Sequence, residues 1–172
     1  MAQKIRLISE FPFSAGELHG AMVSAEYWRA RVAELDGPHA ELSVRHDAGA
    51  VIATVSKPLA ADRIPPRLSK AWPAGLRLDY SERWSPFVDG TARAEVRAAI
   101  SAIGTMSGSY ELRETADGCL CEYVVTVESG IPMAGRLIAG AFAKGVIEDS
   151  GAVDAFTERW LKSRGGVLPG GA

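Results

Sequence analysis

The stretch GRLIAGAFAKGVIEDSGAVDAFTERW, residues 135–160, decides the fold of this chain. Its apolar residues recur at helical spacing, so the pattern predicts one long helix near the C-terminus. The first half is thin, with Ala141 and Gly145 among its small residues, whereas Phe156 and Trp160 make the second half bulky. Because a thin helix cannot fill the space above a curved sheet, we expect a cavity beneath the first half, where a small ligand can bind.

Seven strands and two short helices are expected before this long helix. Residues 4–11 alternate with period two, and Ser14 with Glu17 then forms a capping box for a first short helix. A second short helix is expected over residues 25–35. Turn residues separate the other strands, which are expected at residues 40–46, 51–55, 76–84, 92–98, 106–112 and 119–127.

This order of elements predicts an α+β fold. A curved antiparallel sheet of about seven strands wraps around the long C-terminal helix, and two short helices follow the first strand. We expect residues 1–164 to form one domain and residues 165–172 to form a flexible tail. A chain of 172 residues is long enough for a core with a cavity beside it.

Charge and hydropathy argue against several classes of partner. Lys and Arg number 19 against 21 Asp and Glu, so we expect no nucleic-acid binding. No apolar run is long enough to span a membrane and the N-terminus lacks a secretory signal, so a cytoplasmic protein is expected. A long irregular loop is expected over residues 57–73, where Arg63, Arg67, Lys70 and Trp72 would allow at most weak contact with an anionic membrane. The oligomeric state stays open.

No cofactor and no metal are expected. Cys119 and Cys121 are two residues apart on a strand, so their side chains point the same way, and they lack a second ligand pair for zinc. We interpret them as reduced thiols that pack in the interior. The sequence contains no glycine pattern typical of a phosphate-binding loop and no serine nucleophile motif.

The layout of the chain resembles the START-like superfamily, which includes polyketide cyclases, lipid-transfer START domains and birch-pollen-type plant proteins. The resemblance rests on Phe11-Pro12-Phe13-Ser14-Ala15-Gly16-Glu17-Leu18 before and in the first short helix, and on Ile131-Pro132-Met133-Ala134-Gly135 before the last helix. It covers about residues 3–163, and more narrowly the chain resembles a largely actinobacterial subgroup without an assigned activity. The resemblance implies a helix-grip fold with a deep cavity between sheet and helix, and it transfers no catalytic residue.

The inward face of the predicted strands gives a mostly apolar cavity wall. Tyrosine hydroxyls on such a wall are typical groups for orienting an apolar ligand. The residues expected to bind a ligand are Leu78, Tyr80, Glu82, Trp84, Met106, Tyr110, Tyr123, Ile138, Ala141, Phe142 and Gly145.

Three polar residues are candidates for proton transfer. Glu82 lies on an apolar strand face, where its carboxylate either orients a ligand or acts as a general acid or base, or else meets a cation or solvent. Asp149 either points into the cavity or marks a kink before Ser150-Gly151. His46 ends a strand face beside a turn, where it either switches protonation near neutral pH or lies on the surface.

Two functions fit these features. The first is binding or transport of a small hydrophobic ligand, such as a lipid, an isoprenoid or a polyketide-like compound. The alternative is an enzyme of the cyclase, aromatase or dehydratase type that uses a cavity carboxylate and a tyrosine. The apolar wall favours binding, because the sequence offers few polar pairs for catalysis.

Overall fold

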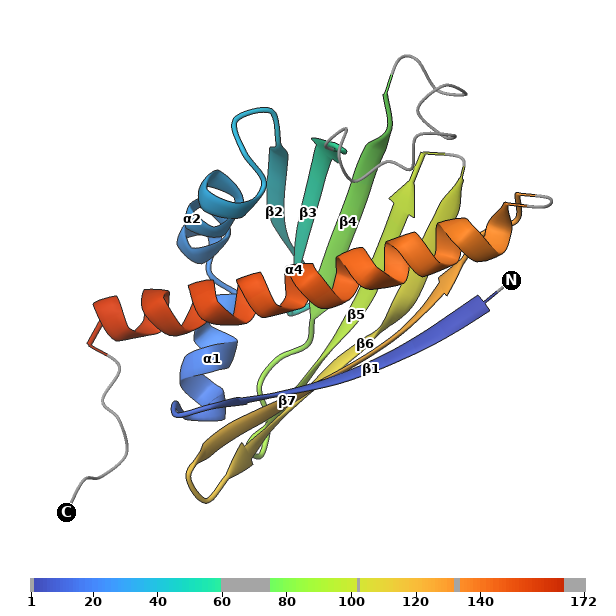
Figure 1. Cartoon of the computed structure of the whole chain (residues 1–172). Coiled ribbons are helices and arrows are strands. Elements are labelled where there is room, and N and C mark those ends of the chain that lie inside the picture. Colours follow the sequence, from blue (N-terminus) through green and yellow to red (C-terminus); the bar gives the residue numbers. More distant parts are fainter. Residues whose placement is uncertain (1, 60–74, 102, 132–133, 166–172) are drawn as a thin grey trace.

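One antiparallel sheet of seven strands curves around a long helix (Figure 1). The computed structural model describes residues 2–59, 75–101, 103–131 and 134–165. The strand order in the sheet is β1-β7-β6-β5-β4-β3-β2, so the first strand pairs with the last and β2 lies at the opposite edge. This arrangement confirms the predicted fold class.

The predicted elements are all present, with small differences at their ends. The strands are β1 (Ala2–Phe11), β2 (Glu41–Asp47), β3 (Ala50–Pro58), β4 (Arg77–Trp84), β5 (Thr91–Ile100), β6 (Gly104–Thr115) and β7 (Gly118–Glu128). The helices are α1 (Ala15–Met22), α2 (Ala25–Leu35) and α4 (Gly135–Ser163). Outside the described residues lie the predicted membrane-contact residues Arg63, Arg67, Lys70 and Trp72, together with Pro132 and most of the predicted tail.

The two short helices begin at side-chain caps. The Ser14 hydroxyl accepts from the Glu17 backbone N–H at 3.2 Å, and the Glu17 carboxylate accepts from the Ser14 N–H at 2.9 Å. This is the predicted capping box. Ser24 caps α2 in the same way, since its hydroxyl accepts from the Tyr27 N–H at 3.4 Å. Both helices lie beside the C-terminal half of α4 (Figure 1).

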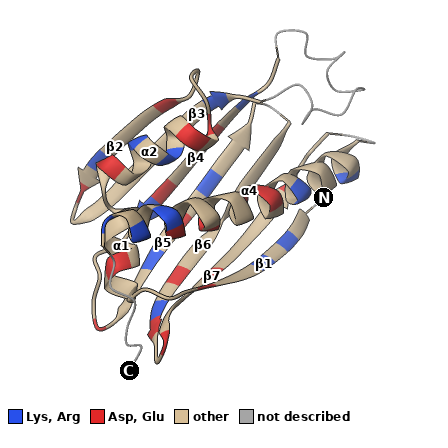
Figure 2. Ribbon diagram, turned by 60° about the vertical axis from the view of Figure 1, so that its left-hand side comes forward, with Lys and Arg blue, Asp and Glu red and all other residues tan. Residues whose placement is uncertain are grey.

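The sheet has an apolar inner face and a charged outer face. In β5, small apolar residues are buried while the residues between them, Arg93, Glu95 and Arg97, are exposed. Arg93 meets Glu111 of β6 at 3.2 Å across the outer face, and both signs of charge occur along the strands (Figure 2). Glycine is required at Gly108, since a Cβ there would lie 2.0 Å from the Val124 carbonyl oxygen.

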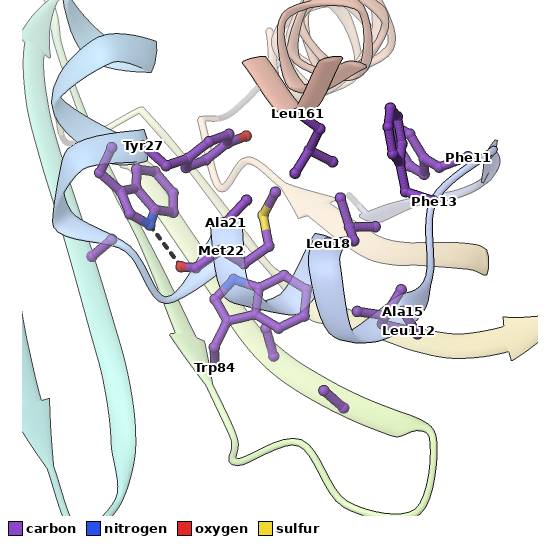
Figure 3. Packing of buried hydrophobic residues seen from close by; sticks show 14 of the residues in the cluster. Phe11, Phe13, Ala15, Leu18, Ala21, Met22, Tyr27, Trp84, Leu112 and Leu161 are labelled. Atoms are coloured by element: carbon purple, nitrogen blue, oxygen red, sulfur yellow. Dashed lines mark hydrogen bonds between the residues drawn. The ribbon is translucent and has the colours of Figure 1, made fainter. Parts of the chain in front are cut away.

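The C-terminal half of α4 closes a densely packed cluster, here called the dense core. Trp28 contributes to this cluster and fixes the α1–α2 corner, because its indole N–H donates to the Met22 carbonyl at 2.8 Å (dashed in Figure 3). Large side chains from β1, the β1–α1 connection, α1, α2, β4, β6 and α4 meet there, namely Phe11, Phe13, Leu18, Tyr27, Trp28, Trp84, Leu112, Phe156 and Leu161. Figure 3 labels seven of them, all but Trp28 and Phe156.

The helix α4 is helical from Gly135 to Ser163, and this range includes Ser150-Gly151. Its apolar face changes partner along its length. Phe156 and Leu161 belong to the dense core, whereas Ala139 and Ala143 pack with the inner face of the sheet in a second cluster. Among the described helices, none is both long and apolar enough to cross a membrane.

Candidate functional site

A pocket of about 230 Å³ lies beneath the N-terminal and middle parts of α4. Its other walls come from α2 and from the inner faces of β3 to β7. Nine of the eleven residues predicted to bind a ligand line it: Leu78, Tyr80, Met106, Tyr110 and Tyr123 from the sheet, and Ile138, Ala141, Phe142 and Gly145 from α4. The structure thus brings most of the predicted set together around one space.

Small residues on both walls keep this space open. Gly145 faces the pocket, and a Cβ built on it would meet no atom within 4 Å. On the sheet, Ala98 of β5 stands between Tyr80 of β4 and Met106 of β6 in the strand register, and it also lines the pocket. The hollow therefore depends on the sheet as well as on the thin half of the helix, and Ala98 was missed from the sequence.

Glu82 and Trp84 lie behind the pocket wall, not on it, which corrects their predicted placement. Glu82 is only 1% exposed, and both of its carboxylate oxygens are occupied. The Tyr80 hydroxyl donates to Oε1, and the Trp84 indole N–H donates to Oε2 at 2.6 Å. Arg31 also reaches Oε1, at 3.4 Å. Alternation correctly predicted that Glu82 and Trp84 point to the inner face of the sheet. It could not predict that both side chains are buried behind the residues that line the pocket.

Arg31 is the cation that sequence reasoning missed. It lies on the buried side of α2, three residues after Trp28, and lines the pocket while remaining only 8% exposed. Its guanidinium lies 4.4 Å from the Trp28 ring centroid and forms an ion pair with Glu82. Burial lowers the pKa of Arg31, but the carboxylate of Glu82 and nearby tyrosines outweigh that effect and raise its pKa well above the ordinary value.

The tyrosines form an aromatic stack along the sheet. The Trp84 and Tyr110 ring centroids are 5.7 Å apart, and those of Tyr110 and Tyr123 are 4.3 Å apart, with nearly parallel planes. The Tyr123 hydroxyl reaches the sulfur of Met106 at 3.6 Å. Burial, followed by the charge of Glu82, raises the pKa of Tyr123 and of Tyr80. The phenols are therefore neutral hydrogen-bond donors at physiological pH.

The other two catalytic candidates differ in position. Asp149 lines the pocket and is partly buried, as one of its two predicted alternatives requires. His46 is exposed near the end of the edge strand β2, opposite Val51, and does not line the pocket. It shares the strand face of Leu42 and Val44 but is exposed at the end of an edge strand next to a turn, which agrees with the predicted alternative of a surface position.

Two further polar residues, Asp36 and Lys57, lie in the pocket wall. Asp36 caps the C-terminus of α2, and Lys57 near the end of β3 forms an ion pair with it. Both cysteines are free thiols. Over the described ranges, no three His, Cys, Asp or Glu side chains gather as a metal site.

Sequence comparison assigns the chain to a family. The family model described as "Protein of unknown function (DUF2505)" matches residues 7–161, nearly the whole chain. The chain belongs to the DUF2505 family. No curated protein matches this DUF2505 member.

Solved structures share its fold at low sequence identity. The ZhuI aromatase/cyclase from Streptomyces sp. R1128 superposes with a TM-score of 0.61 at 11% identity, over 97% of this chain and 100% of that one. Ara h 8.0201 gives a TM-score of 0.62 at 11% identity, over 95% and 99% of the two chains. Norcoclaurine synthase from Thalictrum flavum, in complex with dopamine and hydroxybenzaldehyde, gives 0.57 at 11%, over 94% and 88%. The helix-grip fold of these START and birch-pollen-type proteins is thus the fold of this chain.

Proposed function

We propose that the protein binds a small, mostly apolar molecule in the pocket beneath α4 and holds or carries it. The observation that supports this is the composition of the wall, where Leu, Ile, Met and Phe side chains surround a few tyrosines and charged side chains. The fold adds support, since its neighbours include an aromatase/cyclase and a synthase in complex with two small aromatic molecules. We further propose that residues 1–164 act as a single domain in the cytoplasm, within the largely actinobacterial subgroup named above.

The size of the pocket narrows the range of ligands. Ligand pockets commonly measure about 300–1,000 Å³, and this one measures about 230 Å³. A compact molecule of one to three rings or a short isoprenoid suits this space better than a long-chain lipid does. Among the small hydrophobic ligands considered, polyketide-like and isoprenoid compounds are therefore favoured.

A neutral fluorescent probe tests this proposal. N-Phenyl-1-naphthylamine is apolar and becomes brighter on leaving water, so titration with the protein should show saturable binding. Gly145 has open space toward the pocket, so Gly145→Phe should fill it and weaken probe binding at least about tenfold. Gly140 is exposed on the same helix and lines no part of the pocket, so Gly140→Phe is the matched control. Equal binding by both variants and the unaltered protein would overturn the proposal.

The cyclase-type enzyme remains the second candidate, now on Asp149 and not on Glu82. Glu82 does not line the pocket, whereas Asp149 lines it together with Tyr110 and Tyr123. A carboxylate and a neutral phenol at one space are suitable for general acid–base chemistry. If the protein converts a polyketide-like substrate, Asp149→Asn should abolish turnover and leave probe binding unchanged; turnover that persists would exclude this role.

A further inference from the structure

We propose that the pocket selects an uncharged ligand that presents a carbonyl or hydroxyl oxygen to Arg31, and that it discriminates against carboxylates of the same shape. This inference rests on the proposed ligand binding and specifies the chemical class of the ligand. It follows from how Arg31 and Glu82 are arranged at the wall.

Arg31 uses only part of its hydrogen-bonding capacity on Glu82 and Tyr27. A guanidinium carries five N–H donors, yet its contact with Glu82 is a single one at 3.4 Å and not a two-pronged pair. Oε1 of Glu82 also accepts from Tyr80, and Oε2 accepts from Trp84, so the carboxylate leaves little room for a closer fork. Arg31 lines the pocket, and an acceptor oxygen of a ligand is the natural partner for its remaining donors.

The charge of Arg31, however, is already balanced. Glu82 lies directly behind it and is buried with it. A ligand carboxylate would become a second anion on one cation in a water-poor site, and its lost hydration would exceed what a shared cation returns. A neutral carbonyl loses far less hydration and still gains a charge-assisted hydrogen bond. Among the described residues of the wall, the second cation is Lys57, which forms an ion pair with Asp36.

The pKa shifts of the tyrosines are consistent with this balance. At Tyr80, Tyr110 and Tyr123, the charge of Glu82 raises the pKa by more than the charge of Arg31 lowers it. An anion at these positions therefore meets net repulsion from the pair, in addition to the cost of burial. The part of the wall formed by these three tyrosines therefore favours neutral groups over anions.

Three ligands with one naphthalene skeleton test the inference. 2-Acetylnaphthalene offers a neutral acceptor, 2-naphthoate offers a carboxylate, and 2-isopropenylnaphthalene has the same shape without an acceptor. In competition with N-phenyl-1-naphthylamine at pH 7, the ketone should bind about tenfold more tightly than the isopropenyl compound. It should bind at least about a hundredfold more tightly than the carboxylate. Equal or tighter binding of 2-naphthoate would overturn the inference, whereas failure of the probe itself to bind would overturn the proposed function.

Removing the charge of Glu82 should reverse the selectivity. Glu82→Gln keeps the size of the side chain and leaves Arg31 as an unbalanced cation, so 2-naphthoate should gain at least about tenfold in affinity while the ketone changes little. If 2-naphthoate binds no better to a folded Glu82→Gln variant, the charge balance does not set selectivity. The double variant with Arg31→Met and Glu82→Gln is a control in which both charges are absent. It should still bind the probe, but it should no longer bind the ketone more tightly than the isopropenyl compound. If the double variant still prefers the ketone, Arg31 does not contact the ligand.

Discussion

The two ends of the space between α4 and the sheet are built from the same elements but filled differently. At the C-terminal end of α4, the dense core brings together aromatic side chains such as Phe13, Trp28 and Phe156, two of which have no exposed surface. At the other end, Ala98 and Gly145 face the pocket. One helix and one sheet thus supply stability at one end and an open volume at the other.

The helices α1 and α2 account for this difference. They cover the dense end, insert Leu18, Tyr27 and Trp28 into it and begin at side-chain caps. The start of α4 over the hollow end has no side-chain cap, since its N-cap residue is Ala134. Local structure and packing therefore both concentrate stabilising contacts at the dense end, which leaves the pocket end free to accept a ligand.

The sharpest test of this comparison removes one phenyl ring from each end. Phe13 is fully buried in the dense core, so Phe13→Ala should lower the free energy of unfolding by about 3–5 kcal/mol. Phe142 is partly exposed and borders the pocket, so Phe142→Ala should cost less than about 2 kcal/mol, because part of its surface already faces open space. Urea unfolding of both variants measures the difference. Equal losses would show that the two ends are packed alike.

The boundary between the two ends contains the Arg31–Glu82 pair, and breaking it gives the next largest expected effect. Arg31→Met leaves Glu82 as a buried carboxylate without a cation, so the free energy of unfolding should fall by about 3 kcal/mol. This is the low end of the range for buried ion pairs, because Tyr80 and Trp84 still donate hydrogen bonds to Glu82. Adding Glu82→Gln to this variant should recover most of the loss. Thermal or urea unfolding measures the stability of both variants. If Arg31→Met alone is as stable as the original protein, the ion pair with Glu82 does not contribute to stability.

The dense end and the overall fold could be predicted because they depend on periodicity. Alternation within the strands, the Ser14–Glu17 capping box and the helical stripe of α4 are local signals, and the structure confirms all of them. The bulky second half of α4 also predicted where the interior is filled, since Phe156 does pack there.

The pocket end was harder to predict because it depends on depth and on contacts between distant elements. Alternation placed Glu82 and His46 on an inward face but could not show that one is covered and the other exposed. A small residue such as Ala98 gives no signal of its own in a strand. Arg31 did leave a readable signal, since it follows Trp28 by three residues on the apolar face of α2, where a cation requires a buried partner.

Asp154 provides the smallest expected effect and tests the same boundary from the helix side. It lies between Val153 of the pocket wall and Phe156 of the dense core, and the Ser9 hydroxyl donates to its carboxylate. Burial raises its pKa and Glu158 adds to the rise, whereas the Ser9 hydrogen bond and Arg31 oppose it. The Cys121 thiol is also close enough for its own pKa to be affected by Asp154.

Because the pKa of Asp154 in the folded protein lies above its ordinary value of 3.8, keeping this group ionised costs stability at neutral pH. That cost disappears as the pH falls through the folded pKa toward 3.8 and the carboxyl takes up a proton. Asp154→Asn should therefore be more stable than the original protein at pH 7, by less than about 1 kcal/mol, and the advantage should shrink toward pH 4. Urea unfolding at both pH values measures it, with the exposed Asp117→Asn as the control. If Asp154→Asn is less stable than the original protein at pH 7, the stabilisation from the Ser9 hydrogen bond exceeds the cost of burying the charge. The polar contacts of Asp154 would then stabilise the boundary between the two ends.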